Sequence, residues 1–210
     1  MTPDLIADQI ARAIREGEFG QGAQLVQEDL ARRFGVSRNP IREALRLLEA
    51  NGLVEIRGGG GATVRTLSSD DLVELYGLRK VLEPTIAEAL VDSSTQRAVA
   101  ELDSMATAMA DEPRIPQWME LNYTFHQRLY VLSGLPRTAS ILTSLLSAVQ
   151  PYSRRNIEDL GGKEQADVEH RSIVDALRAH DSDRLAALFV QHLEGAERRL
   201  RPAPAASTAL

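Results

Sequence analysis

The sequence predicts a mainly α-helical protein, with an N-terminal winged helix-turn-helix, including a small β-hairpin wing, followed by a C-terminal all-α helical bundle. The elements change near residue 66: three short helices and two short strands are expected before it, and helical periodicity alone after it. The net charge also changes there: residues 1–66 hold nine arginines and nine acidic residues, whereas the remainder holds 15 basic and 21 acidic ones. The expected units are a winged helix-turn-helix at 1–66, a linker at 67–69, a helical domain at 70–201 and a disordered tail at 202–210.

The first 50 residues contain three segments in which apolar residues recur at helical spacing. Gly17, Gly35 and the pair Asn51-Gly52 are placed to end them, and Ser37 is placed as the N-cap of the third. Glycine-rich residues 17–24 are typical of a turn. The three helices are expected at about residues 5–17, 27–34 and 38–50.

Residues 53–57 and 62–66 flank a run of four glycines, Gly58 to Gly61, and the first of them alternates between apolar and charged side chains. Two short strands around a glycine turn predict a hairpin, the wing of the fold. Ser68 to Asp71 then have the composition of a helix cap. Further helices are expected at about 70–91, 95–110, 115–133, 137–159, 164–179 and 183–200, with a kink at Pro151.

Composition excludes several classes of protein. The 210-residue chain has no cysteine, so disulfides and cysteine-ligated zinc are excluded. No apolar run approaches the roughly 20 residues of a membrane span, and the N-terminus lacks the apolar stretch of a signal peptide. We therefore expect a cytoplasmic protein without a membrane partner.

The third helix has the pattern of a DNA-recognition helix. Between Arg32 and Arg46 there are five arginines and one acidic residue, Glu43. The apolar positions share one face of the helix, and polar residues lie on the other, where arginine can read guanine and asparagine can read adenine in a major groove. An arginine-rich face is often only solvated surface, but the turn, cap and hairpin in order favour DNA binding. The apolar face consists of Ile41, Ala44, Leu45 and Leu48, and the polar face of Arg38, Asn39, Arg42 and Arg46.

This segment resembles the GntR family of regulators, whose Val-Ser-Arg-x-Pro-x-Arg-Glu-Ala-Leu string is matched by residues 36–45. Gln21 stands where the family usually has proline, and Asn39 where it commonly has threonine. The resemblance implies a homodimer, because one recognition helix covers only half of a near-palindromic operator. It implies DNA contacts by Ser37, Arg38, Asn39, Pro40, Arg42, Arg46, Arg57, Gly58 and Gly59.

All four histidines lie beyond residue 125. Asn122 and His126 are four residues apart and share a helix face, but spacing alone cannot show that His170 and His192 meet them. A histidine on a helix is more often a satisfied polar residue than a ligand. His180, near a helix end, is expected at the surface.

The C-terminal region, about residues 70–200, is similar to the FCD ligand domain of the FadR subgroup of GntR regulators. Residues 72–90, Phe125-His126, Glu169-His170 and His192-Leu193 carry the similarity. It implies a divalent metal, with an asparagine where many such domains have aspartate. Three imidazoles and an amide oxygen suit zinc or nickel. The implied ligands are Asn122, His126, His170 and His192.

The resemblance also implies a small carboxylate effector that completes the metal coordination and controls a repressor or activator, with repression favoured. Arg79 is the best second anchor for the anion, although a structural salt bridge explains it equally well; Arg128, Arg154 and Arg155 are weaker candidates. Glu169 is expected to point away, because it adjoins His170 in sequence. Without a general base, a metal-dependent hydrolase or lyase is the minor alternative, and a ligand-free dimerisation domain is another.

Overall fold

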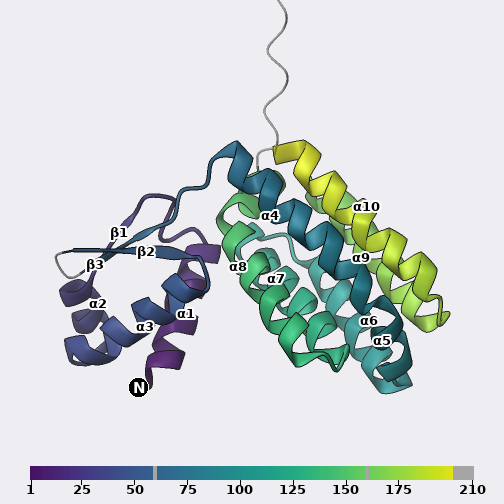
Figure 1. The fold of residues 1–210 in the computed structure, drawn as a ribbon, viewed down its shortest axis with the longest axis horizontal. Coiled ribbons are helices and arrows are strands. Elements are labelled where there is room, and N and C mark those ends of the chain that lie inside the picture. Colours follow the sequence, from purple (N-terminus) through teal and green to yellow (C-terminus); the bar gives the residue numbers. More distant parts are fainter. Residues whose placement is uncertain (59–60, 159–160, 201–210) are drawn as a thin grey trace, which may run out of the picture.

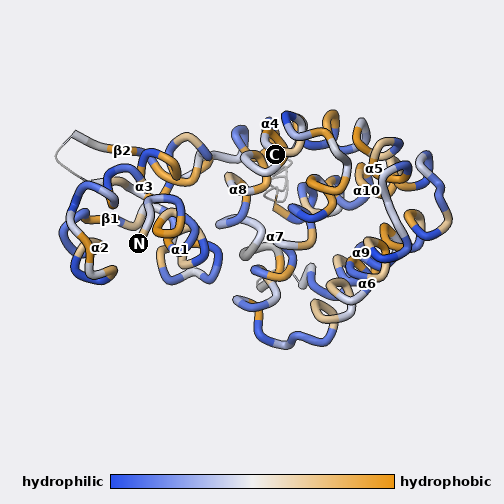
Figure 2. The backbone as a smooth tube through the Cα atoms, turned by 90° about the horizontal axis from the view of Figure 1, so that it is seen from below, coloured by the Kyte–Doolittle hydropathy of each residue, from blue (hydrophilic) through white to orange (hydrophobic). Residues whose placement is uncertain are grey.

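The computed structural model describes residues 1–58, 61–158 and 161–200, and shows a small N-terminal domain beside a larger helical domain (Figure 1). Seen from below, the strands with the first three helices form one lobe, and the remaining helices form the other (Figure 2). The elements are α1 (Pro3–Arg15), β1 (Gln24–Val26), α2 (Gln27–Phe34), α3 (Arg38–Ala50), β2 (Val54–Arg57), β3 (Gly61–Val64), α4 (Ser69–Leu82), η1 (Glu83–Ile86), α5 (Ala87–Ser93), α6 (Gln96–Asp111), α7 (Ile115–Leu132), α8 (Pro136–Glu158), α9 (Lys163–Arg178) and α10 (Ser182–Leu200).

The N-terminal domain has the predicted winged helix-turn-helix. Gly35 ends α2 in the left-handed conformation (φ 63°), which makes the tight turn into α3. The α3 face formed by Ile41, Ala44, Leu45 and Leu48 is buried against α1 and α2, as the apolar spacing predicts. The opposite face of α3 is therefore left to solvent.

The wing is part of a three-stranded antiparallel sheet with the order β1-β3-β2. The sequence predicts β2 and β3 but not β1, whose residues were expected in and beside a turn. Leu25 is 1% exposed and pairs with Ala62 of β3. A three-residue strand is too short to show a period, so tertiary pairing determines it. The Leu25 carbonyl would lie 3.0 Å from a Cβ at Gly61, which explains a glycine there.

The second domain is helical, and its core is built from buried residues of η1, α5, α6, α7, α8, α9 and α10. The predicted capping box of α4 is present, with the Ser68 hydroxyl and the Asp71 backbone and side chain paired. The single helix expected at 70–91 is wrong: it is divided into α4, η1 and α5. Pro84 has no N–H and its ring clashes with the preceding turn, so a 3-10 turn replaces the α-helix there.

Pro151 lies inside α8. The expected disordered tail lies outside the described residues. Across the described ranges, no helix combines the length and apolar character needed to cross a membrane.

Candidate functional site

The polar face of α3 is exposed. Arg38, Asn39, Arg42 and Arg46 are all exposed, and none of them pairs with another described residue. Ser37 occupies the N-cap position of α3, but its hydroxyl makes no capping hydrogen bond. The hydroxyl therefore lies at the helix N-terminus without being used by the cap. Such a face can donate to base edges and phosphates together.

The remaining predicted DNA contacts divide between described and undescribed residues. Pro40 is half-buried in the first turn of α3, and Gly58 is exposed just after β2. The backbone of Arg57 ends β2, but its side chain lies outside the described residues, as does Gly59.

Three histidines from three helices meet in the second domain. His126 lies on α7, His170 on α9 and His192 on α10, and one ring nitrogen of each lies within 4.8 Å of the others. All three side chains are buried. Sequence spacing left this convergence open. The packing of α9 against α10, and of α7 in the same core, produces it.

The cluster fits a metal ion. His126 Nε2 and His170 Nε2 lie 3.3 Å apart, about the separation of two nitrogens bound at roughly 2.0–2.1 Å to one tetrahedral ion. The same distance also fits a hydrogen bond between the two rings, so this distance is compatible with a shared metal ion and with a direct contact. Asn122 is buried, makes no hydrogen bond to another described residue, and lines a cavity of about 40 Å³ with His126 and His192. That volume holds an ion and a few water molecules.

Electrostatics keep two of the imidazoles in the ligating form. Burial lowers the pKa of His126 and His170 well below the usual value, and repulsion from neighbouring histidines lowers it further. Neutral imidazole is the form that binds metals. His126 and His170 are thus neutral at physiological pH without a metal to deprotonate them.

Glu169 lies at the cluster, which corrects the expectation that it points away. Its Oε2 accepts a 2.6 Å hydrogen bond from His192 Nδ1, and its Oε1 accepts a 2.9 Å bond from Gln165. Burial alone would raise the pKa of Glu169, but the interaction with His192, the hydrogen bond from Gln165 and the charge of Arg199 together outweigh it, and the pKa is lowered. Adjacent helical residues project about 100° apart, so His170 and Glu169 can flank the same partner on α10.

Arg79 lines the histidine cavity but is engaged in a buried ion pair. It is 3% exposed, and its Nε donates to Glu83 Oε1 at 2.7 Å. Its Nη2 donates to the Tyr130 hydroxyl at 3.3 Å, and that hydroxyl donates to Glu83 at 2.8 Å. The i,i+4 spacing could have indicated Glu83; nothing local indicated Tyr130. Arg199 of α10 also lines the cavity, and the sequence reasoning missed it.

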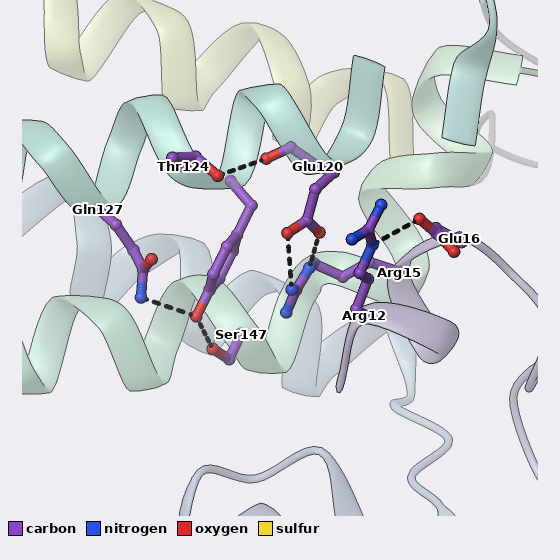
Figure 3. Close-up of polar contacts among 8 residues, drawn as sticks. Arg12, Arg15, Glu16, Glu120, Thr124, Gln127 and Ser147 are labelled. Atoms are coloured by element: carbon purple, nitrogen blue, oxygen red, sulfur yellow. Dashed lines mark hydrogen bonds and ion pairs between the residues drawn. The ribbon is translucent and has the colours of Figure 1, made fainter. Parts of the chain in front are cut away.

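A second polar cluster joins the two domains (Figure 3). Arg15 at the end of α1 donates from Nε and Nη2 to the Glu120 carboxylate of α7, at 2.8 and 3.3 Å. Its guanidinium lies 4.0 Å from the centre of the Tyr123 ring, whose hydroxyl contacts Ser147 of α8 and accepts from Gln127. These residues border a cavity of about 500 Å³ between α1, α7 and α8. The sequence does not indicate this contact, because its partners are 105 residues apart.

The fold and the two sites define a class of protein: a DNA-binding winged helix-turn-helix joined to a helical domain with a buried histidine cluster. Comparison with known proteins assigns each of the two domains to a family. Residues 3–64 match the gntR family of bacterial regulatory proteins, and residues 74–195 match the FCD domain. The chain therefore belongs to the GntR family of transcription regulators, with an FCD domain at its C-terminal side.

Individual relatives of known sequence or structure are also transcription regulators. The chain is 31% identical to the transcriptional repressor NanR of Enterobacter sp. (strain 638), over 90% of this chain and 82% of NanR. It is 32% identical to the transcriptional regulator YdhC of Bacillus subtilis (strain 168), over 58% of this chain but only 56% of YdhC. A crystal structure of a GntR regulator from Rhodococcus sp. RHA1 superposes with a TM-score of 0.80 at 25% identity, covering 94% of this chain and 96% of that one. These proteins are regulators, and this chain is a regulator rather than an enzyme.

Proposed function

We propose that this protein is a metal-containing, effector-controlled repressor of the FadR subgroup, which binds a near-palindromic operator as a homodimer. The single observation that carries the effector half of the proposal is the meeting of His126, His170 and His192 in one buried cluster. GntR regulators bind operator DNA, and the similarity to the repressor NanR favours repression. A protein that acts on chromosomal operators acts in the cytoplasm.

In the operator complex, α3 enters the major groove. Arg38, Asn39, Arg42 and Arg46 contact base edges and phosphates from its exposed face, and Ser37 and Pro40 adjoin a phosphate at its N-terminus. The wing, with Arg57, Gly58 and Gly59, follows the backbone or the minor groove. A dimer is required because one α3 reads only a half-site.

In the helical domain, the three histidines and the Asn122 amide oxygen hold zinc or nickel. These metals accept imidazole nitrogen, and a site with only three or four protein donors keeps positions open for a further ligand. When bound, the metal supplies a Lewis-acidic centre to which the carboxylate of a small organic acid can bind. The protein's own contribution is a small cavity and two imidazoles, His126 and His170, that burial keeps neutral.

The cavity also suggests how the acid is selected. Its volume of about 40 Å³ holds an ion and a few water molecules, so an acid that is larger than this requires the lining helices to separate. Arg79 and Arg199 border it and supply positive charge toward the anion. Arg79 is already paired with Glu83 and Tyr130, so we assign it two indirect roles: it shapes the cavity wall and contributes positive potential. To contact the acid directly, it would have to exchange those partners for the carboxylate.

The signal to the DNA travels along α7. This helix carries Asn122 and His126 toward the cavity, and Glu120 and Tyr123 toward Arg15 of the DNA-binding domain. The linker adds a second contact, because the Leu67 N–H donates to the Tyr152 hydroxyl of α8. A small shift of α7 on effector binding therefore moves α1 and the recognition helix, which links effector and operator affinities.

The experiment is a thermal-shift screen of small carboxylic acids on zinc- or nickel-loaded protein, with H170A as the comparison. A specific ligand at 100 times its Kd adds about 2.7 kcal/mol of stability. A shift that is lost in H170A supports the metal pocket as the sensor. No shift with any acid, together with no retained metal, would favour a ligand-free dimerisation domain and leave the family assignment intact.

A further inference from the structure

One carboxylate stands next to the histidine cluster. Glu169 Oε2 lies 2.6 Å from His192 Nδ1, and the Glu169 side chain is 9% exposed. Gln165, one turn earlier on α9, donates to the other carboxylate oxygen at 2.9 Å. Both oxygens are therefore held, and the carboxylate has a defined direction toward the His192 ring.

This contact determines which nitrogen of His192 can bind a metal. A carboxylate accepts hydrogen bonds, so the proton of a neutral His192 lies on Nδ1 and donates to Glu169. The lone pair is then on Nε2, at the other side of the ring. In contrast, His126 Nδ1 and His170 Nδ1 have no partner in the described part of the chain, so no carboxylate orients those two rings there.

We propose that Glu169 is a positioning residue for the metal centre: it holds His192 as the Nδ1–H tautomer, directs Nε2 to the ion, and supplies negative charge through the ring. The proposal rests on the metal centre of the proposed function. Charge matters here because the four assigned ligands are three imidazoles and an amide, all neutral. A carboxylate hydrogen-bonded to a ligating histidine also raises the basicity of the ring.

The competing explanation is a structural ion pair that only fastens α9 to α10. Both explanations predict that loss of Glu169 lowers thermal stability, so stability does not separate them. The His192 tautomer and the metal affinity do. Only a positioning role requires both to depend on the carboxylate.

The first test needs no metal. Ring-nitrogen NMR of the metal-free protein, at mildly alkaline pH where a free imidazole is neutral, reads the His192 tautomer directly. We expect Nδ1–H in the native protein and in E169Q, whose amide oxygen can still accept, and loss of that preference in E169A. An unchanged tautomer in E169A would overturn the proposal.

The second test measures affinity for Zn²⁺ and Ni²⁺ alone, by competition with a chromogenic chelator. We expect about ten- to hundredfold weaker binding in E169A, and a smaller loss in E169Q, which keeps the hydrogen bond but not the charge. E164Q is the matched control, since Glu164 is exposed on the same helix. Equal affinity in E169A and the native protein overturns the positioning role. If E169A does not fold, the metal affinity of E169Q decides, because this variant removes only the negative charge: an affinity equal to that of the native protein overturns the positioning role.

The two tests separate this inference from the proposed function. If the native protein binds neither ion, the metal centre itself is wrong, whatever the tautomer. If the native protein binds the ions and Glu169 variants bind them equally well, the metal centre stands and the role of Glu169 is wrong.

Discussion

Glu120 of α7 accepts two hydrogen bonds from Arg15 of α1, and thereby joins the DNA-binding domain to the helix that carries His126. The Arg15 side chain is 7% exposed, and its guanidinium also lies over the Tyr123 ring. Tyr123 is one residue from Asn122. The interdomain contact and the histidine cavity thus occupy different faces of the same turns of α7.

The Arg15–Glu120 pair should carry coupling between the domains. A double-mutant cycle with R15A, E120A and the double variant is expected to give an interaction energy of about 0.5–3 kcal/mol in urea unfolding. We also expect R15A to weaken the change in operator Kd caused by metal and effector. R97A is the control, because Arg97 is exposed on α6 of the helical domain and its loss should leave the response intact. Native-like regulation in R15A would exclude this route.

Arg42 should contribute to operator recognition. We expect R42A to cost about 1–3 kcal/mol of operator binding and to relax specificity at one base position, because a bidentate arginine–guanine contact is lost. The measurement is operator binding against a set of single-base variants at fixed salt concentration. R97A, an exposed change on the helical domain, serves as the control. A loss that is uniform across all base variants would instead make Arg42 a phosphate contact.

Asn122 should limit the charge of the metal site. Replacing it with aspartate adds a carboxylate where the amide stands, so N122D is expected to bind Mn²⁺ at least about tenfold more tightly, and Zn²⁺ with a smaller gain. The same carboxylate should destabilise the metal-free protein, because it is buried without a metal to offset it. T124D adds equal charge at an exposed position of α7 and should leave the metal affinity unchanged. Unchanged metal affinity in N122D would remove residue 122 from the ligand set.

The metal-free protein should lose stability in mild acid. The folded-state pKa of His126 and His170 lies well below the usual value, so below about pH 6.5 the unfolded chain takes up protons that the folded chain does not. The contribution of these two histidines to the free energy of unfolding is therefore fully present above that pH. It falls as the pH decreases, by about 1.4 kcal/mol per pH unit for each histidine. Urea unfolding in chelator, kept above about pH 5 so that Glu169 stays ionised, measures the slope.

Two histidine-to-asparagine variants test the origin of that slope. H170N should flatten it, since one buried imidazole is removed. H180N should not, because His180 is exposed, and asparagine tolerates its positive φ of 54°. Equal slopes in the native protein and H170N would show that the buried histidines do not control acid stability.

The sequence by itself determined the local structure and the α3 surface. Helical spacing placed Ile41 and Leu45 on the buried face of α3 and Arg42 on the exposed one, because a 3.6-residue period divides a helix into faces without reference to the rest of the chain. The turn at Gly35 was predicted for the same reason: a left-handed residue is a local requirement.

Only the tertiary structure decided the contacts between distant segments. The packing of three helices brings His126, His170 and His192 into one cluster, and it turns Glu169 toward His192 against the sequence-based expectation. It also pairs β1 with β3, and Arg15 with Glu120 across 105 residues. Periodicity gives the direction of a side chain relative to its own helix axis. The packing angles between helices, which depend on the whole core, determine what that side chain meets.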